Sequence, residues 1–321
     1  MSTPSEHWLG GYYFFQTRVD SRGTWGAGSQ LIDQWSIGDP PAETREGETG
    51  MKKRSHPVWL FCVLLIVSIS GTALTADYED TLLLAETLAS VLVEDYGLTS
   101  IQYALLSQGQ LVLSGHNASS DFIQKVDGQT IYGIGSTSKV VTTAAVMLLV
   151  DRGLVVLDTP VTAYIPEFYM QDERYRDITV RMLLNHSSGL MGTNYGNAAH
   201  VNTVPAQDWP AFLRDLAKQR LKADPGAFSV YCNDGFTLAE LLVERVSGLT
   251  FSEFLRNELF NPLGMAQTYT PYDSFDHNQM APTFIVVGNE PVLIRDMLRV
   301  LGTGGILSSA EDLVLFARIF M

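Results

Sequence analysis

The hydrophobic and polar positions divide the chain into segments of different character. Residues 1–50 show no sustained period of two or 3.6, so they predict neither a helix nor a strand. From Asp80 to Tyr96 the pattern predicts a helix. Its apolar stripe is formed by Leu83, Leu84, Leu88, Val91 and Leu92. Residues 101–106 and 110–114 then read as two strands around Gln108-Gly109, which indicates a β-hairpin.

Helical patterns dominate the rest of the chain. An almost continuously apolar helix is expected from Ser136 to Asp151, closed by Gly153. Further helices are expected at 177–184, 207–218, 235–247, 252–260 and 309–320. A hairpin followed by many helices favours an α+β fold over a parallel βαβ sheet.

Local signals support several of these helix boundaries. Thr250 with Glu253 and Ser308 with Glu311 have the spacing of capping boxes. Gly248 fits the position just after the helix expected at 235–247.

A segment of different composition begins at Met51. Lys52-Lys53-Arg54 is followed by an apolar run at 58–69 and then by small residues up to Ala76, which is typical of a secretory signal peptide. Cleavage is expected after Ala73 or Ala76. The alternatives are a membrane anchor or a buried helix, although the run is short for a span of ~20 apolar residues.

These observations predict the organisation of the chain. Met51 is the expected true start, so residues 1–50 would be a mis-assigned N-terminal extension. Residues 51–76 would be the signal peptide and residues 77–321 the exported domain, which is secreted, periplasmic or associated with the cell envelope.

Composition narrows the classes of partner. Of 321 residues, 46% are hydrophobic and 17% charged, which excludes a disordered or fibrous chain. The two cysteines exclude a disulfide scaffold and a cysteine-based zinc site. The net charge of −14 argues against nucleic acid and anionic membrane surfaces. We expect a monomer that acts on a small-molecule or peptide substrate, without cofactor or metal, and meets the membrane only through its signal segment.

The chemistry centres on Ser136, at the start of the apolar helix. Lys139 lies one turn later on the same face. A lysine there opposes the helix dipole and faces a desolvation cost, so a purely structural design would rarely place it there. A nucleophilic serine needs a neighbour to manage its proton, and a desolvated lysine can do this. Taken alone the pattern is weak, and the alternative reads Ser136 as a helix N-cap and Lys139 as a solvated residue.

A second candidate cluster is Tyr231-Cys232-Asn233, on a loop leading into the helix expected from Gly235. Tyr231 and Asn233 point to the same side of an extended segment. Tyrosine can act as a general base if cations lower its pKa from ~10, and asparagine can hydrogen-bond both the lysine and a substrate amide. The alternative is a turn in which Asn233-Asp234-Gly235 caps the helix. Cys232 is the weaker nucleophile candidate, because no histidine is near it in sequence.

Four motifs occur in a defined order along the chain. They are Ser136-Thr137-Ser138-Lys139, the segment 183–190 (LLNHSSGL), Tyr231-Cys232-Asn233, and the segment 302–313 (GTGGILSSAEDL). Over about residues 80–321 the chain resembles the serine β-lactamase-like family, which includes class C β-lactamases, D-Ala-D-Ala carboxypeptidases and related esterases and peptidases.

The resemblance implies both a fold and residue roles. The fold is an antiparallel sheet with flanking helices plus a mostly helical region. Ser136 would be the acylated nucleophile, Lys139 and Tyr231 would share the proton transfers, and Asn233 would position the substrate and Lys139. The Ser136 N–H would be one oxyanion donor.

One departure from the family pattern concerns whether the domain is complete at its C-terminus. The family carries a third motif, Lys-Thr-Gly or His-x-Gly, on a later strand that also supplies the second oxyanion donor. The sequence shows no such motif before Met321. We therefore expect the domain to be incomplete at its C-terminus, without its last strands, and the apolar face of the Ser136 helix to meet water.

The remaining motifs carry less weight. His186 is expected to hold its loop rather than act as a base. The other histidines show no metal-ligand spacing. Ile134 breaks the Gly-x-Ser-x-Gly pattern of an α/β-hydrolase, and no phosphate-binding loop follows Gly302–Gly305. The leading hypothesis is an exported serine hydrolase that forms an acyl-enzyme on amide, β-lactam or ester bonds. The alternative is a non-catalytic or truncated relative that binds a peptide or a peptidoglycan-like ligand.

Overall fold

The computed structural model describes residues 78–120, 125–193, 199–201, 205–281, 283–287 and 290–321. The extension and signal peptide expected over residues 1–76 lie outside this part of the chain, so they stay predictions. None of the helices described is long and apolar enough to cross a membrane.

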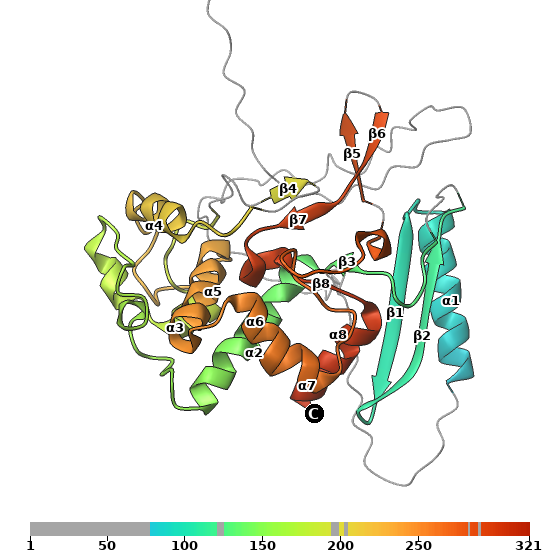
Figure 1. Cartoon of the computed structure of the whole chain (residues 1–321), viewed down its shortest axis with the longest axis horizontal. Coiled ribbons are helices and arrows are strands. Elements are labelled where there is room, and N and C mark those ends of the chain that lie inside the picture. The colour runs from blue at the N-terminus through green and yellow to red at the C-terminus, as the bar shows by residue number, and fades with distance from the viewer. Residues whose placement is uncertain (1–77, 121–124, 194–198, 202–204, 282, 288–289) are drawn as a thin grey trace, which may run out of the picture. The chain divides into compact units, whose positions relative to one another are not determined.

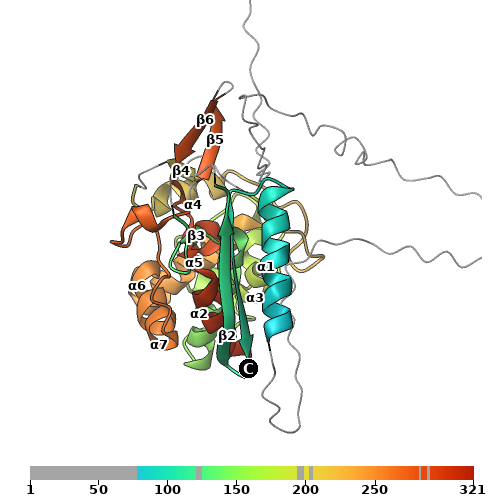
Figure 2. The same cartoon turned by 90° about the vertical axis from the view of Figure 1, so that its right-hand side faces the viewer.

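A hairpin between two helices forms one side of the described unit (Figures 1 and 2). As predicted, helix α1 (Glu79–Glu94) precedes strands β1 (Ser100–Ser107) and β2 (Gln110–Ala118), which pair antiparallel. The two residues of the turn between β1 and β2 both have positive φ, 49° at Gln108 and 74° at Gly109, as a tight two-residue hairpin turn requires.

The hairpin contacts α1 on one face and α8 (Ala310–Phe316) on the other. Side chains alternate between the faces of a strand, and the neighbours Gln102 and Tyr103 show this alternation. Gln102 accepts a hydrogen bond from the Ala310 N–H of α8, whereas Tyr103 lies near Glu86 of α1.

The apolar stripe expected on the first helix does not face the protein. Ala89 and Val93 are buried against the hairpin, whereas Leu83, Leu84 and Leu88 are 63%, 59% and 53% exposed. The helix was predicted correctly, and the structure shows which of its faces packs against the hairpin.

The hydrophobic core lies between the helices on the other side of the unit. Helix α5 (Asn233–Ser247) is buried along most of its length and packs against α2 (Ser138–Asp151), α3 (Val180–Leu184) and α6 (Phe251–Leu255). Leu238, Leu241 and Leu242 of α5 are fully buried. Each such side chain contributes roughly 1.5–3 kcal/mol relative to exposure, so the core holds α2 and α5 in one arrangement.

Shorter elements complete the helical side. The predicted helix at 207–218 is α4 (Trp209–Ala217), and the one at 252–260 divides into α6, a π-helical turn at Arg256–Phe260 and α7 (Asn261–Leu263).

On α2, Val140 and Met147 are 43% and 42% exposed, so part of its apolar face does meet water.

In the described part of the chain, three further two-stranded antiparallel sheets occur that were not predicted. Strand β3 (Tyr132–Gly133) pairs with β8 (Leu307–Ser308), β4 (Ala199–Val201) with β7 (Asp296–Leu298), and β5 (Thr283–Val287) with β6 (Glu290–Ile294). Strands of two to five residues are too short to establish a period of two in the sequence. The α+β class is nevertheless correct.

The two predicted capping boxes had different outcomes. Thr250 and Glu253 form the predicted box, and Gly248 ends α5 with φ 74°. The box predicted at Ser308 and Glu311 is wrong by one residue. Ser308 belongs to β8, and Ser309 caps α8 by accepting the Asp312 N–H. Pairing with β3 therefore decides where this helix begins.

Candidate active site

A tight turn between β3 and α2 presents Ser136. Gly135–Thr137 forms one 3-10 turn that leads directly into α2, and Gly135 has φ 51°, a conformation that favours glycine. Ser136 is exposed, while the helix that follows is largely buried. The reading of Ser136 as the helix N-cap is wrong, because Thr137 occupies that position and makes no side-chain cap. The helix dipole at this end favours negative charge that develops beside Ser136.

The fold brings the three predicted catalytic side chains together. Lys139 Nζ lies 3.1 Å from Ser136 Oγ, and the Tyr231 hydroxyl lies 2.7 Å from the same oxygen. Lys139 Nζ is also 4.8 Å from the centre of the Tyr231 ring. Ser136 and Lys139 share one helical turn, whereas Tyr231 reaches them from the loop before α5.

Lys139 is nearly buried, with 6% of its surface exposed, so the alternative of a solvated helix residue is wrong. Burial is the largest influence on its amine and lowers its pKa. The hydrogen bond and charge of Tyr231 oppose this effect without cancelling it. At a given pH, a larger fraction of Lys139 is thus in the uncharged form, which can accept a proton, than of a lysine exposed to water.

The two residues after Tyr231 face different surroundings. Asn233 begins α5 and donates from Nδ2 to Thr193 Oγ1 over 2.9 Å. Its expected contacts with substrate and Lys139 stay predictions. Cys232 is buried, with its thiol 3.5 Å from the Gly192 carbonyl oxygen, and burial raises the thiol pKa. A buried thiol that resists ionisation is a poor nucleophile.

The sequence analysis missed a backbone group in the site. The Thr303 carbonyl oxygen accepts a hydrogen bond from Lys139 Nζ over 2.6 Å. The Thr303 hydroxyl donates to the Asn233 carbonyl, which ties the segment Leu301–Gly305 to the start of α5. The Gly-rich segment at 302–305 was noted as a family motif, but side-chain chemistry gives no signal for a carbonyl acceptor.

The buried carboxyl group of Glu240 is hydrogen-bonded to the backbone of the segment Leu301–Gly305. Glu240 Oε2 accepts the Gly302 N–H over 2.8 Å, and the Thr142 hydroxyl donates to the Gly302 carbonyl over 2.8 Å. Burial is the main cause that raises the pKa of Glu240 well above its usual value. The raised pKa favours the neutral carboxyl group, which can accept the backbone N–H without placing a negative charge in the core.

Gly302 has no side chain, so its backbone can lie close to Glu240 on α5. Gly302→Ala tests whether this close approach is needed for stability. A Cβ at position 302 would lie 2.9 Å from the Phe236 carbonyl oxygen and 2.9 Å from Glu240 Cβ. We expect a loss of ~1–3 kcal/mol in unfolding free energy by urea titration, because overpacking displaces the segment. Gly133→Ala is the control, since its nearest contact would be 4.0 Å away. Equal losses in both variants would contradict this account.

His186 lies against the site although it is distant in sequence from Tyr231. Its Nδ1 accepts the Cys232 N–H over 3.1 Å, and its ring lies 4.6 Å from that of Tyr231. It therefore holds two loops together, in the structural role that the sequence predicted.

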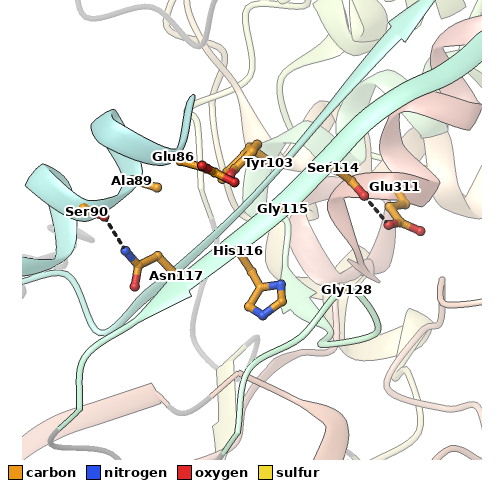
Figure 3. A pocket seen from close by; sticks show the side chains of 10 residues that line it. All are labelled: Glu86, Ala89, Ser90, Tyr103, Ser114, Gly115, His116, Asn117, Gly128 and Glu311. Carbon is orange, nitrogen blue, oxygen red and sulfur yellow. Dashed lines mark hydrogen bonds between the residues drawn. The ribbon is translucent and has the colours of Figure 1, made fainter. Parts of the chain in front are cut away.

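Of two cavities in the described part of the chain, one adjoins the site and the other lies apart from it. A mostly apolar one of about 550 Å³ extends from Lys139 and His186 along the exposed face of α2. A polar one of about 680 Å³ lies between α1, β2 and the start of α8 (Figure 3). Two pairs of its polar side chains are hydrogen-bonded to each other, Ser114 with Glu311 and Asn117 with Ser90, and none of the three clustered side chains lines it.

Known proteins resemble both the sequence and the structure. Penicillin-binding protein 4 of Amycolatopsis lactamdurans is 32% identical over 61% of this chain and 52% of its own length. The D-alanyl-D-alanine-carboxypeptidase/endopeptidase AmpH of Escherichia coli is 27% identical over 60% of this chain and 49% of its own length. The chain thus spans about half the length of these relatives.

A solved structure shares the fold. The octameric penicillin-binding protein homologue from Pyrococcus abyssi aligns with a TM-score of 0.60 and 26% identity, over 75% of this chain and 56% of that one. The family model described as Beta-lactamase matches residues 85–320, which is more than half of the chain and includes every residue of the Ser136 cluster. By sequence and by fold, this chain belongs to the serine β-lactamase-like family.

Proposed function

We propose that the chain carries the acylation machinery of an exported serine hydrolase that cleaves amide, β-lactam or ester bonds. The supporting observation is that Ser136 Oγ lies within hydrogen-bond distance of both Lys139 Nζ and the Tyr231 hydroxyl. A serine hydroxyl attacks a carbonyl only if a neighbour takes its proton, and this site holds two such neighbours.

The proposed reaction has two stages. Ser136 Oγ attacks the acyl carbonyl as its proton passes to the Lys139–Tyr231 pair, and the Ser136 N–H with the helix dipole stabilises the resulting oxyanion. The pair returns the proton to the leaving group as the tetrahedral intermediate collapses to an ester on Ser136. Water then attacks this ester as its proton passes to the same pair, and the pair returns that proton to Ser136 Oγ as the bond to the acyl group breaks, which frees Ser136 and the acid product.

Lysine and tyrosine suit this exchange for a physical reason. The lowered pKa of Lys139 brings its neutral form within reach, while its contact with the Thr303 carbonyl fixes the amine beside Ser136. Tyr231 is half exposed and can approach the leaving group from the solvent side. Both groups contact Ser136 Oγ, so each is in position to accept its proton.

The substrate class follows from the relatives. One is a penicillin-binding protein and another a D-alanyl-D-alanine carboxypeptidase/endopeptidase, so β-lactams and D-Ala-D-Ala peptides are the first substrates to test. Such substrates belong to the cell envelope, in agreement with the export expected from residues 51–76. A monomer stays our prediction.

A non-catalytic binding protein is the less favoured alternative. Burial of a lysine amine costs free energy, and a binding site would gain nothing from placing that amine against a serine hydroxyl. The contact of Ser136 with both proton carriers is better explained by acyl transfer.

Acyl-enzyme formation tests the proposal directly. The full chain would be incubated separately with a fluorescent penicillin, a D-Ala-D-Ala depsipeptide and a nitrophenyl ester, and analysed by intact mass and peptide mapping. We expect one acyl group per chain, located on the peptide that contains Ser136. An adduct on another residue, or no adduct with any of the three at millimolar concentration, would refute the proposed function.

A further inference from the structure

His186 contacts the Tyr231 segment on both sides of the tyrosine. Its backbone carbonyl accepts the Val230 N–H over 2.9 Å, and its side-chain Nδ1 accepts the Cys232 N–H over 3.1 Å. The two donors are the residues immediately before and after Tyr231. One histidine therefore fixes the backbone that carries the tyrosine hydroxyl to Ser136.

The imidazole ring also packs against the tyrosine itself. The ring centres of His186 and Tyr231 are 4.6 Å apart with a 34° tilt, and the Phe236 ring lies 5.1 Å away on α5. His186 has φ 63°, a left-handed conformation that few residues other than glycine, asparagine, aspartate and histidine adopt. Backbone, hydrogen bond and ring contact all constrain the tyrosine.

The hydrogen bond requires one protonation state of the ring. Nδ1 accepts the Cys232 N–H only when it carries no proton, which places the single ring proton on Nε2. Protonation would make Nδ1 a donor facing a donor. It would also add a cation close to Lys139. Both effects oppose the arrangement that holds Tyr231.

We propose that neutral His186 is a positioning residue that holds the Tyr231 hydroxyl against Ser136, and that protonation of its Nδ1 releases the tyrosine and lowers acylation at acid pH. This inference rests on the proposed function, because it assigns His186 to the same acylation step.

The surroundings of His186 favour its neutral form. Burial is the main cause that lowers its pKa from 6.5, the charges of Lys139 and Lys222 act in the same direction, and the hydrogen bond with the Cys232 backbone opposes the shift without reversing it. Tyr231 is the titratable group whose ring contacts that of His186, the thiol of Cys232 belongs to the residue that donates to Nδ1, and Asp234 is the acid near that thiol. The hydrogen bond from the Cys232 N–H to His186 is therefore fully formed above the pKa that His186 has in the folded protein. It is lost as the pH falls through that pKa.

Two substitutions separate the hydrogen bond from the titration. In His186→Asn, Oδ1 takes the place of Nδ1 as acceptor, asparagine tolerates the left-handed backbone, and the amide does not titrate. In His186→Ala the acceptor and the ring are both lost, and the Cys232 N–H loses its partner. His116→Asn is the matched control, because His116 lies on β2 among the residues of the polar cavity.

The expected result is a set of pH profiles for acylation of the full chain by a fluorescent penicillin. Wild type and His116→Asn should share an acidic limb below neutral pH. His186→Asn should keep the plateau rate within a few-fold and lose that limb, whereas His186→Ala should fall ~10–100-fold at all pH values. An unchanged limb in His186→Asn would overturn the proposal.

Nitrogen-15 NMR of the histidine rings gives an outcome that does not depend on activity. We expect His186 Nδ1 to be unprotonated at neutral pH, and the Tyr231 ring resonances to shift as His186 titrates. A proton on Nδ1, or a Tyr231 signal independent of His186, would overturn the inference even if acylation occurs. If penicillin labels no variant while the two rings titrate together, the proposed function fails and the positioning contact stands.

Discussion

Ser136→Ala is expected to abolish covalent labelling by acylating probes while the protein stays folded. Ser136 Oγ is the oxygen on which Lys139 and Tyr231 converge, so no other hydroxyl of the cluster can form the ester in its place. Loss of the nucleophile should lower the acylation rate by at least ~10³-fold, to the background of the assay. Because Ser136 is exposed and caps no helix, the unfolding free energy should change by no more than ~0.5 kcal/mol.

Thr137→Ala is the matched control for this substitution. Thr137 carries the adjacent hydroxyl in the same exposed turn, and its side chain makes no cap for α2. Labelling of Thr137→Ala should match the wild type within a few-fold, as measured by intact mass after timed quenching. If Ser136→Ala were labelled at the wild-type rate, the assignment of the nucleophile would be wrong.

Lys139→Met is expected to slow acylation by ~10²–10⁴-fold. Methionine fills a similar volume but offers no group to accept the Ser136 proton or to donate to the Thr303 carbonyl. Stability at neutral pH should not fall in parallel, because the substitution also removes the cost of burying an amine. Single-turnover labelling and urea unfolding of the same preparations measure the two effects. Val140→Met, on the exposed face of the same helix, controls for the new side chain.

The stability difference between wild type and Lys139→Met should depend on pH. The folded-state pKa of Lys139 is lowered from 10.5, so between the two pKa values the unfolded chain binds more protons than the folded one. Wild-type unfolding free energy therefore gains from Lys139 as pH rises through this window, a contribution that Lys139→Met lacks. Urea titrations between pH 7 and pH 10 should show the wild type gaining relative to the variant. A constant difference would mean that Lys139 is not desolvated.

Family membership and the residues of the candidate site could be predicted from the sequence. Ser136 and Lys139 are three positions apart across a 3-10 turn that leads directly into α2, so local geometry alone places them together. Tyr231-Cys232-Asn233 was connected to them through the order of the motifs and the family resemblance, because no local rule relates residues almost a hundred positions apart. The long helices and the first hairpin were also predicted, since each spans enough residues to establish a period.

Tertiary structure alone decided the groups that support the site. The Thr303 carbonyl and the Glu240 carboxyl act through positions that packing selects, and a backbone oxygen has no signature in a sequence. The direction of α1 follows the same principle. The sequence predicts a helix with a leucine stripe, but packing in the folded chain buries Ala89 and Val93 and leaves Leu83, Leu84 and Leu88 exposed.

The sequence by itself therefore determined the local elements, the candidate nucleophile and its lysine, because each depends on spacings within a few turns of chain. Only the tertiary structure decided which distant groups meet them. Burial lowers the pKa of Lys139, the Thr303 carbonyl fixes its amine, and His186 binds both sides of Tyr231. These interactions depend on long-range packing between α2, α5 and the segment Leu301–Gly305, and packing at such separations follows from the whole core rather than from any one stretch of sequence.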